Sequence, residues 1–352
     1  MNHVIWIRRL AFIGAILCLA VVVLGGYTRL SDSGLGCPDW PGCFGHVAPT
    51  GSAEHYATGA DVRKAWVEMI HRYAAGTLGL IVLVNTVFAY RARRERGVNL
   101  WFAIALLALV VLQGILGMLT VTWLLKPLIV TGHLLGGLTT FALLLWMWLT
   151  IRAHDKPVNG ASVLVGNRLV ESGRRARLWA GLALAALALQ IFLGGWTSSN
   201  YAAVACPDFP RCQNQWLPDA DYQSAFVLWR GLGINYAGGV LDHPARVAIH
   251  FTHRLGAVLA SILLLLAAHA ALRGLGNEAR WAGLAVLAAL LLQLSIGIFM
   301  VWRAFPLPIA AAHNAGAALL VAATVWLNRR LRPVADFDKS HFSGPISRGR
   351  FG

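Results

Sequence analysis

Residues 37–43 read CPDWPGC, and residues 206–212 read CPDFPRC. The two loops lie 169 positions apart and share both cysteines, both prolines and the aspartate. Each follows a related stretch at the same spacing, LGGYTRL at 24–30 and LGGWTSS at 193–199. A loop that recurs with its flanking sequence predicts a chain built by duplication.

The repeat continues beyond the cysteine loops. HRYAAG at 71–76 corresponds to HRLGAV at 253–258, at an offset of 182, and GHLLGG at 132–137 corresponds to AHNAGA at 312–317, at an offset of 180. Each half therefore contains the same ordered set of segments. Because an even number of membrane spans per half keeps the halves parallel, we expect a pseudo-twofold axis along the membrane normal. Parallel repeats also occur in transporters, so duplication alone does not choose a function.

The composition is that of a membrane protein. Of 352 residues, 57% are hydrophobic and 13% are charged, and the mean hydropathy is +0.61. Runs long enough to cross about 30 Å of hydrocarbon begin near 10, 68, 99, 127, 177, 245, 281 and 306. We predict an all-α integral membrane protein whose eight transmembrane helices form two parallel four-helix bundles. The predicted divisions are an N-terminal half (1–152), a linker (153–174), a C-terminal half (175–332) and a tail (333–352).

The basic residues predict the orientation in the membrane. The net charge is +15, but the arginines and lysines cluster at alternate span boundaries, namely Arg8 with Arg9, 91–96, 174–177, Arg273 with Arg280, and 329–332. The positive-inside rule assigns these boundaries to the cytoplasm, so nucleic acid is not an expected partner. We predict a multi-pass protein of the cell inner membrane with an uncleaved first span and both termini cytoplasmic.

Both cysteine loops then face the periplasm. Oxidising compartments permit disulfides, so Cys37 with Cys43 and Cys206 with Cys212 are candidate disulfide clamps. A zinc site that adds His46 is the alternative for the first pair, but no histidine is comparably placed beside the second. Cys18, inside the first span, is interpreted as a packing residue.

Four histidines lie inside apolar spans and belong to the repeat: His71, His133, His253 and His313. Each lies six to eight residues inward from the predicted outer end of its span, roughly 9–12 Å at helical rise. Ionisable groups inside a membrane are functional candidates by default, although any single one could serve only as a hydrogen-bonding group between helices. Two histidine pairs at one depth, among small residues and without a cysteine or acidic cluster, favour heme iron over zinc.

The halves differ beside the first histidine of each pair. Glu68 lies three residues before His71, on the same helix face, whereas the position that matches Glu68 at the 182-residue offset is His250. A carboxylate beside a bound heme could act as an acid or base, which predicts one reactive site and one electron-transfer site. A structural carboxylate paired with Arg72 is the alternative.

Arginines and glutamines accompany the histidines. The predicted outer face carries Arg29, Arg72, Arg254 and Arg303, which either bind heme propionates or extend to the membrane interface. Gln113 and Gln293 occupy equivalent places in spans three and seven, and we expect each to bond across helices.

Several of these motifs together resemble heme A synthase, a membrane enzyme of cytochrome oxidase biogenesis. They are GGYTRL at 25–30, CPDWPGC at 37–43, EMIHR at 68–72, HR at 253–254 and AHN at 312–314. The similarity extends over roughly residues 8–330. It implies oxidation of a heme O methyl group to a formyl group by successive hydroxylations, which gives heme A.

The resemblance also implies roles for the site residues. His71 and His133 would hold the substrate heme O, His253 and His313 would ligate the iron of a permanent heme b, and Glu68 would be the catalytic carboxylate. The second-loop disulfide would be structural, and the first-loop pair would be redox-active or would help to position heme. His250 departs from a symmetric pattern and is interpreted as a neighbour of the ligands.

Partners and two other functions stay open at this level. The resemblance implies heme O supplied by a heme O synthase, membrane lipid, an electron acceptor that is a quinone or a protein, and a homo-oligomer as one possible state. A b-type cytochrome that relays electrons from a quinol is the main alternative, but its hemes would more naturally lie near opposite membrane faces. A transporter is the third reading, although the spans lack broken-helix signals at the midplane.

Overall fold

A computed structural model describes residues 3–49, 59–95, 97–154, 167–273 and 276–332. Within these ranges the chain is helical, with no strand beyond two isolated bridges in the cysteine loops. The helices are α1 (His3–Leu30), α2 (Gly59–Arg91), α3 (Leu100–Thr122), α4 (Pro127–His154), α5 (Asn167–Ser199), α6 (Tyr222–Ala225), α7 (His243–Leu272), α8 (Asn277–Trp302) and α9 (Leu307–Leu331), with a short 3-10 turn η1 (Ala203–Ala205). The prediction of an all-α protein is confirmed.

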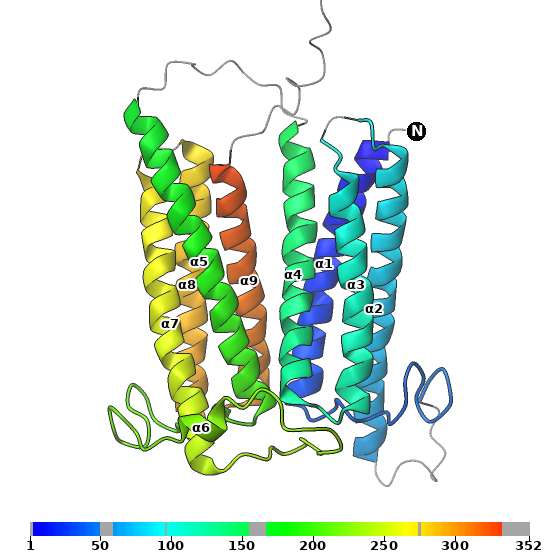
Figure 1. The fold of residues 1–352 in the computed structure, drawn as a ribbon, viewed down its shortest axis with the longest axis vertical. Coiled ribbons are helices and arrows are strands. Elements are labelled where there is room, and N and C mark those ends of the chain that lie inside the picture. Colours follow the sequence, from blue (N-terminus) through cyan, green and yellow to red (C-terminus); the bar gives the residue numbers. More distant parts are fainter. Residues whose placement is uncertain (1–2, 50–58, 96, 155–166, 274–275, 333–352) are drawn as a thin grey trace, which may run out of the picture.

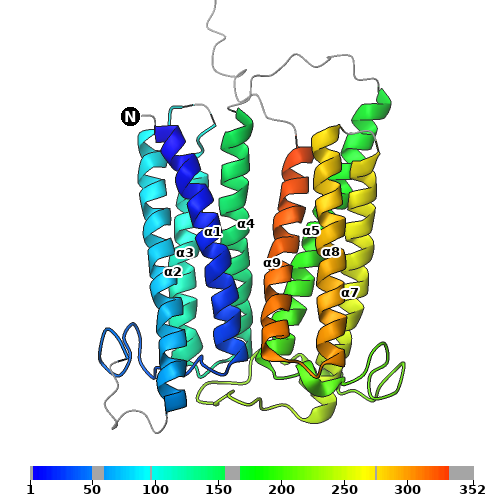
Figure 2. The same cartoon turned by 180° about the vertical axis from the view of Figure 1, so that it is seen from behind.

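The long helices stand in two groups side by side (Figures 1 and 2). In the first group α1 packs against α2 and α4, and α3 packs against the same two helices. In the second group α5 and α8 each pack against α7 and α9. The groups meet where α1 contacts α9, α4 contacts α5, and α4 contacts α9. The pseudo-twofold relation between the groups stays a prediction.

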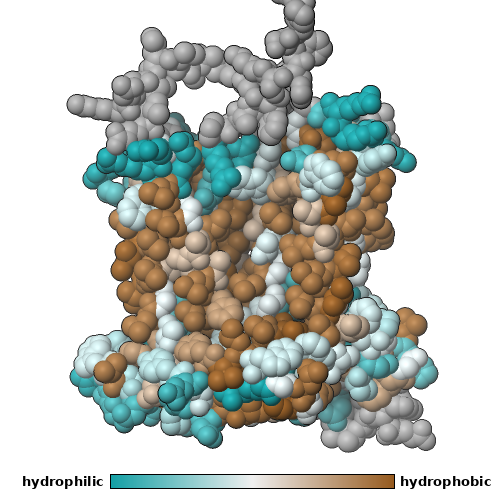
Figure 3. Space-filling view, in the orientation of Figure 1, coloured by the Kyte–Doolittle hydropathy of each residue, from teal (hydrophilic) through white to brown (hydrophobic). Residues whose placement is uncertain are grey.

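Eight helices in the described ranges are long and apolar enough to cross a membrane. They are the eight long helices, and they cover all eight apolar runs predicted from composition. On the face seen in Figure 3, hydrophobic side chains form a broad belt across these helices, with hydrophilic residues gathered at the two ends. Such a belt matches the hydrocarbon layer, so the chain is a multi-pass membrane protein.

The two ends of the helical groups differ in what they carry. The cysteine loops and α6 lie at one end, while the start of α1 and the end of α9 lie at the other (Figure 1). Two short turns at the loop end have the same form, because Leu124 and Leu125 in one, and Ala304 and Phe305 in the other, adopt positive φ angles of 51–60°. The loop end of the molecule is the end that carries the cysteine loops, α6 and these two turns.

Some predicted boundaries differ from the structure. Helix α2 begins at Gly59, earlier than the predicted apolar run. Its first turns contain the charged residues Asp61, Arg63 and Lys64, so a search for apolar residues does not include them. The segment 153–174, predicted as a linker, is helical at both ends, since α4 runs to His154 and α5 starts at Asn167. Residues 155–166 and the predicted tail 333–352 lie outside the described residues.

Candidate functional site

A cavity of about 2350 Å³ extends across both helical groups towards the loop end. Its lining is mostly apolar and comes from both groups. All four span histidines line it, as do Glu68, His250 and Arg29. The volume exceeds the roughly 300–1000 Å³ of a typical small-molecule pocket, so the cavity has room for more than one large ligand.

The first histidine pair is spaced for shared ligation of one metal. The ring centroids of His71 and His133 are 6.4 Å apart, with their planes at 85°. Two imidazoles on opposite sides of one metal would have centroids about 6 Å apart, given metal–nitrogen bonds of about 2.0–2.1 Å. Direct packing of two rings covers a similar range of about 4.5–7 Å. Each ring, however, keeps a buried Nδ1 without a hydrogen-bond partner, as expected for rings that receive a further group.

Each of the four histidines faces a glycine on a neighbouring helix. A Cβ on Gly25 of α1 would lie 2.7 Å from His71 Cε1, and one on Gly297 of α8 would lie 3.0 Å from His313 Cε1. The corresponding separations are 3.4 Å for Gly117 against His133 and 3.1 Å for Gly194 against His253. The rings therefore fill space that any larger residue would occupy. These close contacts come from adjacent helices and not from the small residues on the histidines' own helices.

The second histidine pair has glutamine neighbours. The side-chain nitrogen of Gln190 in α5 lies 3.0 Å from His253 Nδ1, and it also donates to the His253 carbonyl oxygen at 3.0 Å. The side-chain nitrogen of Gln293 lies 3.2 Å from His313 Nε2. The expected cross-helix bond is thus confirmed for Gln293. It is wrong for Gln113, whose buried amide has no hydrogen-bond partner although it lies against Gly136.

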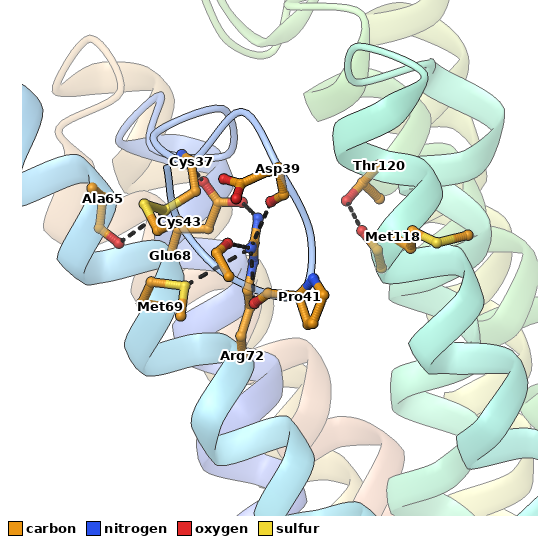
Figure 4. A network of polar contacts seen from close by, with 12 residues as sticks. Cys37, Asp39, Pro41, Cys43, Ala65, Glu68, Met69, Arg72, Met118 and Thr120 are labelled. Carbon is orange, nitrogen blue, oxygen red and sulfur yellow. Dashed lines mark hydrogen bonds and ion pairs between the residues drawn. A yellow bond between two sulfur atoms is a disulfide. The ribbon is translucent and has the colours of Figure 1, made fainter. Parts of the chain in front are cut away.

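Glu68 joins α2 to the first cysteine loop (Figure 4). Its carboxylate accepts from the Arg72 guanidinium at 2.5 Å and from the backbone amide of Cys37 at 3.0 Å. The Glu68 residue is only 4% exposed, so its charge depends on these partners. The ion pair predicted as the structural alternative therefore exists, and the same carboxylate also reaches the cavity wall.

The Arg72 side chain holds the first cysteine loop by binding the backbone of that loop. Its Nη1 donates to the carbonyl oxygens of Asp39 at 2.9 Å and of Gly42 at 2.6 Å. The Asp39 carboxylate in turn accepts from the amides of Phe44 at 2.6 Å and Gly45 at 2.7 Å. The disulfide, the arginine and the aspartate together fix a loop above the first histidine pair.

The second loop is held in the same way. Arg254 donates to the carbonyl oxygens of Arg211 at 2.7 Å and Cys206 at 3.0 Å. His250 takes the place of Glu68, and its Nε2 lies 3.3 Å from Arg254 Nε. A neutral imidazole thus occupies the position that an acid occupies in the first half. His250 is a neighbour of the second histidine pair, as predicted, and its Nδ1 has no partner.

Arg29 connects the two halves at the loop end. Its Nη2 donates to the Ser198 carbonyl oxygen at 2.7 Å, and its guanidinium lies 4.1 Å from the centre of the Tyr201 ring. The Tyr201 hydroxyl donates to Asp32 at 3.0 Å. Arg29 with Ser198, and Asp32 with Tyr201, are both separated by the repeat offset of 169 residues. Repeat-related positions therefore contact each other between the helical groups.

The cysteine pairs form disulfides in the structure. Cys37 is bonded to Cys43 and Cys206 to Cys212, with Cα separations of 4.8 Å and 4.7 Å. All four cysteines are buried. The zinc alternative for the first loop fails because its thiolates are consumed, and among the described residues no cluster of three metal-ligating groups forms. Cys18 is a free, buried packing residue, as expected.

Comparison with known proteins decides the family. The model of the COX15-CtaA family, described as cytochrome oxidase assembly protein, matches residues 8–325. A protein named heme A synthase from Shewanella oneidensis is 40% identical over 92% of this chain and 95% of its own length.

The chain belongs to the heme A synthase family. A protein of the same name from Caulobacter vibrioides is 29% identical over 92% of this chain and 95% of its own length. Another from Halalkalibacterium halodurans is 26% identical over 87% of this chain and 91% of its own length. The resemblance predicted from the sequence motifs is therefore confirmed at the level of the family.

Two features of this heme A synthase family member were missed from the sequence alone. Gln190 contacts a span histidine but has no repeat twin, since the matching position is Val21. Arg246, in the first turns of α7, lines the cavity with a buried Nε that has no partner. A comparison of mismatched repeat positions would have found Gln190. Arg246 matches Lys64 at the 182-residue offset, so the repeat places a basic residue at this position in both halves.

Proposed function

We propose that the chain is a heme A synthase that oxidises a methyl group of heme O to a formyl group by successive hydroxylations. Membership of the family supports this activity and disfavours the alternatives of a quinol-linked cytochrome and a transporter. The observation that carries the proposal is one cavity lined by two histidine pairs, of which only the first has a carboxylate beside it.

The residues present fit two hemes. His71 and His133 would hold the substrate heme O, because both line the cavity and their buried Nδ1 atoms have no protein partner. His253 and His313 would ligate the iron of heme b. Bound iron supplies the electron transfer and oxygen chemistry that amino acid side chains lack. The apolar lining of the cavity excludes bulk water from the methyl group.

Glu68 is proposed as the proton-transfer group. Hydrogen bonds from Arg72 and from the Cys37 amide hold its carboxylate at the cavity wall near His71. With water as the source of the oxygen atom, conversion of the methyl group to a formyl group releases four protons and four electrons. The Glu68 carboxylate would accept the protons at its oxygen atoms, and the electrons would pass to the quinone or partner protein. The Arg72 pair keeps the carboxylate oriented between turnovers. The matching His250 has no acid function in this scheme.

The location and partners follow from the same proposal. The loop end would face the periplasm, both termini would lie in the cytoplasm of a cell with an inner membrane, and the heme sites would lie near the periplasmic side. Basic residues such as Arg330, at the opposite end from the cysteine loops, support this orientation. Heme O would come from a heme O synthase, and electrons would leave to a quinone or a partner protein.

The propionate groups of the hemes need cationic partners near the loop end. Arg246 is the strongest candidate, since its Nε is buried without a partner on the cavity wall. Arg29 also keeps a buried, unpartnered Nε. Arg72 and Arg254 donate to loop carbonyl oxygens, so we assign them to loop support and to the orientation of Glu68 and His250.

The test is heme analysis of cells that make this protein together with a heme O source. Extraction and mass analysis should find heme A, and the purified protein should contain heme b. Cells with the heme O source alone should contain heme O without heme A. Two stably bound b hemes and no heme A would support the cytochrome alternative, and protein without heme would support the transporter.

A further inference from the structure

The two halves differ in what supports the first histidine of each pair. In the second half, the Gln190 side chain reaches His253 from the adjacent helix α5. In the first half, the matching position is Val21 in α1, and His71 Nδ1 has no hydrogen-bond partner. The second half therefore places a polar side chain on its histidine, whereas in the first half the matching side chain is apolar and only the Val21 backbone offers a polar group near His71.

A second difference makes room for the first. Gly256 lies one turn after His253, and a Cβ there would collide with Gln190 Oε1 and lie 2.7 Å from Leu193 Cδ1. The position that matches Gly256 at the 182-residue offset is Ala74. The pair Gln190 and Gly256 thus replaces Val21 and Ala74 as a unit. This coupling indicates that the Gln190 contact is a built feature of the second half.

The chemistry of the contact suits a histidine that binds iron. A ligating histidine normally donates its other ring N–H to an oxygen acceptor, which fixes the ring and strengthens it as a ligand. The Gln190 amide nitrogen now lies against His253 Nδ1, while its Oε1 is buried without a partner. If the amide were turned over, Oε1 would accept from Nδ1–H. The donation to the His253 carbonyl oxygen would then be lost, and Oε1 would have to shift away from that carbonyl oxygen because both atoms are acceptors.

We propose that Gln190 is a positioning residue that makes the second histidine pair retain its heme, while the first pair, which lacks this support, exchanges its heme. The inference rests on the proposed function, because an enzyme of this kind must keep a cofactor heme and release a product heme. His253 remains the ligand, and Gln190 acts through it. Gly256 keeps the space that Gln190 needs.

The experiment measures heme release from the purified holoprotein. Excess apomyoglobin serves as the heme acceptor, and the rate at which heme b leaves is followed by absorbance. Gln190→Leu should speed this release about 10–100-fold, the usual effect of removing a partner of a metal-bound histidine. The reduction potential of the remaining heme b should rise, because the lost acceptor no longer enriches the ring in electrons.

Three variants control for a merely structural effect. Gln190→Glu retains an acceptor and should restore slow release, with a lowered potential. Gln113→Leu removes a buried glutamine from the other half and should leave heme b release unchanged. The double variant Val21→Gln with Ala74→Gly should slow the release of heme from the first pair.

The outcomes separate this inference from the proposed function. Release from Gln190→Leu within about twofold of the wild type, with an unchanged potential, would overturn the inference even if heme A is made normally. Failure of the double variant to slow release would also count against it. If Gln190→Leu does not fold, the double variant and Gln190→Glu decide the question. Wild-type protein without heme b would overturn both proposals.

Discussion

The N-terminal and C-terminal helical groups share a framework and differ beside their histidines. In both groups, the arginine directly after the first histidine of the pair, Arg72 in α2 or Arg254 in α7, donates to backbone carbonyl oxygens of the disulfide loop. An aspartate within each loop, Asp39 or Asp208, accepts from backbone amides of the same loop. Beside the first histidine of each pair, however, one group has Glu68 and Val21 where the other has His250 and Gln190. The shared parts hold the site, and the differing parts give each site its own chemistry.

This contrast teaches where to look for function in a duplicated chain. Positions that agree between the halves, such as the disulfides, explain how the loops are closed over the cavity. Positions that disagree explain why two similar sites would treat their hemes differently. In the proposed scheme, Glu68 supports the reaction in one half and Gln190 supports heme retention in the other.

The largest effect is expected from Glu68→Gln. This change removes the ionised acceptor while it keeps the side-chain size, so heme A formation should fall at least about 100-fold, the scale of acid–base catalysis. Heme O or a hydroxylated intermediate should accumulate, as measured by mass analysis of extracted heme. The heme b spectrum should not change.

The matched change in the other half is His250→Gln. It removes a titratable side chain beside the second pair, and we expect no accumulation of a hydroxylated intermediate. If both variants block heme A formation at the same step, the assignment of reaction to the first half is wrong.

A smaller difference is expected between the two loop clamps. Arg72→Leu leaves Glu68 buried without its cation and frees loop carbonyl oxygens, which should destabilise the closed loop by about 3–5 kcal/mol. Arg254→Leu loses carbonyl contacts without stranding an acid, at a cost of about 1–3 kcal/mol. Hydrogen exchange at the Cys43 and Cys212 amides, which close the matching turns, measures both. Equal losses of loop stability in Arg72→Leu and Arg254→Leu would mean that the ion pair between Arg72 and Glu68 adds no stability to the first loop.

Removal of each disulfide should separate the loops by function. Replacement of Cys37 and Cys43 by serine frees the segment whose amide orients Glu68, so heme A formation should fall by about tenfold, a loss of about 1.4 kcal/mol. Replacement of Cys206 and Cys212 should leave that rate within about threefold and speed heme b release. The reverse pattern in the two assays would contradict the assignment of the reactive site.

The smallest effect is the acid response of the first loop. Partial burial opposes ionisation of Asp39, but the Gly45 and Phe44 amides and the Arg72 charge hold its pKa below the usual value. Because the folded pKa lies below the unfolded value of about 3.9, this support is complete above that pH and is lost as pH falls through the folded pKa. Exchange at Cys43 should therefore rise below about pH 4. This rise in exchange at the Cys43 amide should be absent in the Asp39→Asn variant. The same rise in that variant would show that Asp39 is not the group responsible.

Sequence predicted the membrane fold well because composition and charge act over whole spans. The eight apolar runs, the paired cysteines and the shared depth of the four histidines all carry repeated signals. The contacts of Arg72 could not be predicted, since backbone carbonyl oxygens leave no mark in the sequence. Helix α6 and Gln190 were missed for a different reason. Neither has a counterpart in the other half, so the comparison of repeated motifs did not reveal them.

The central claim is that the two histidine pairs hold different hemes. Its most direct test is mass analysis of the hemes that copurify with His71→Ala and with His253→Ala, each made together with a heme O source. The first variant should keep heme b and lose heme O and heme A, and the second should lose heme b. Loss of the same heme from both variants would contradict the claim.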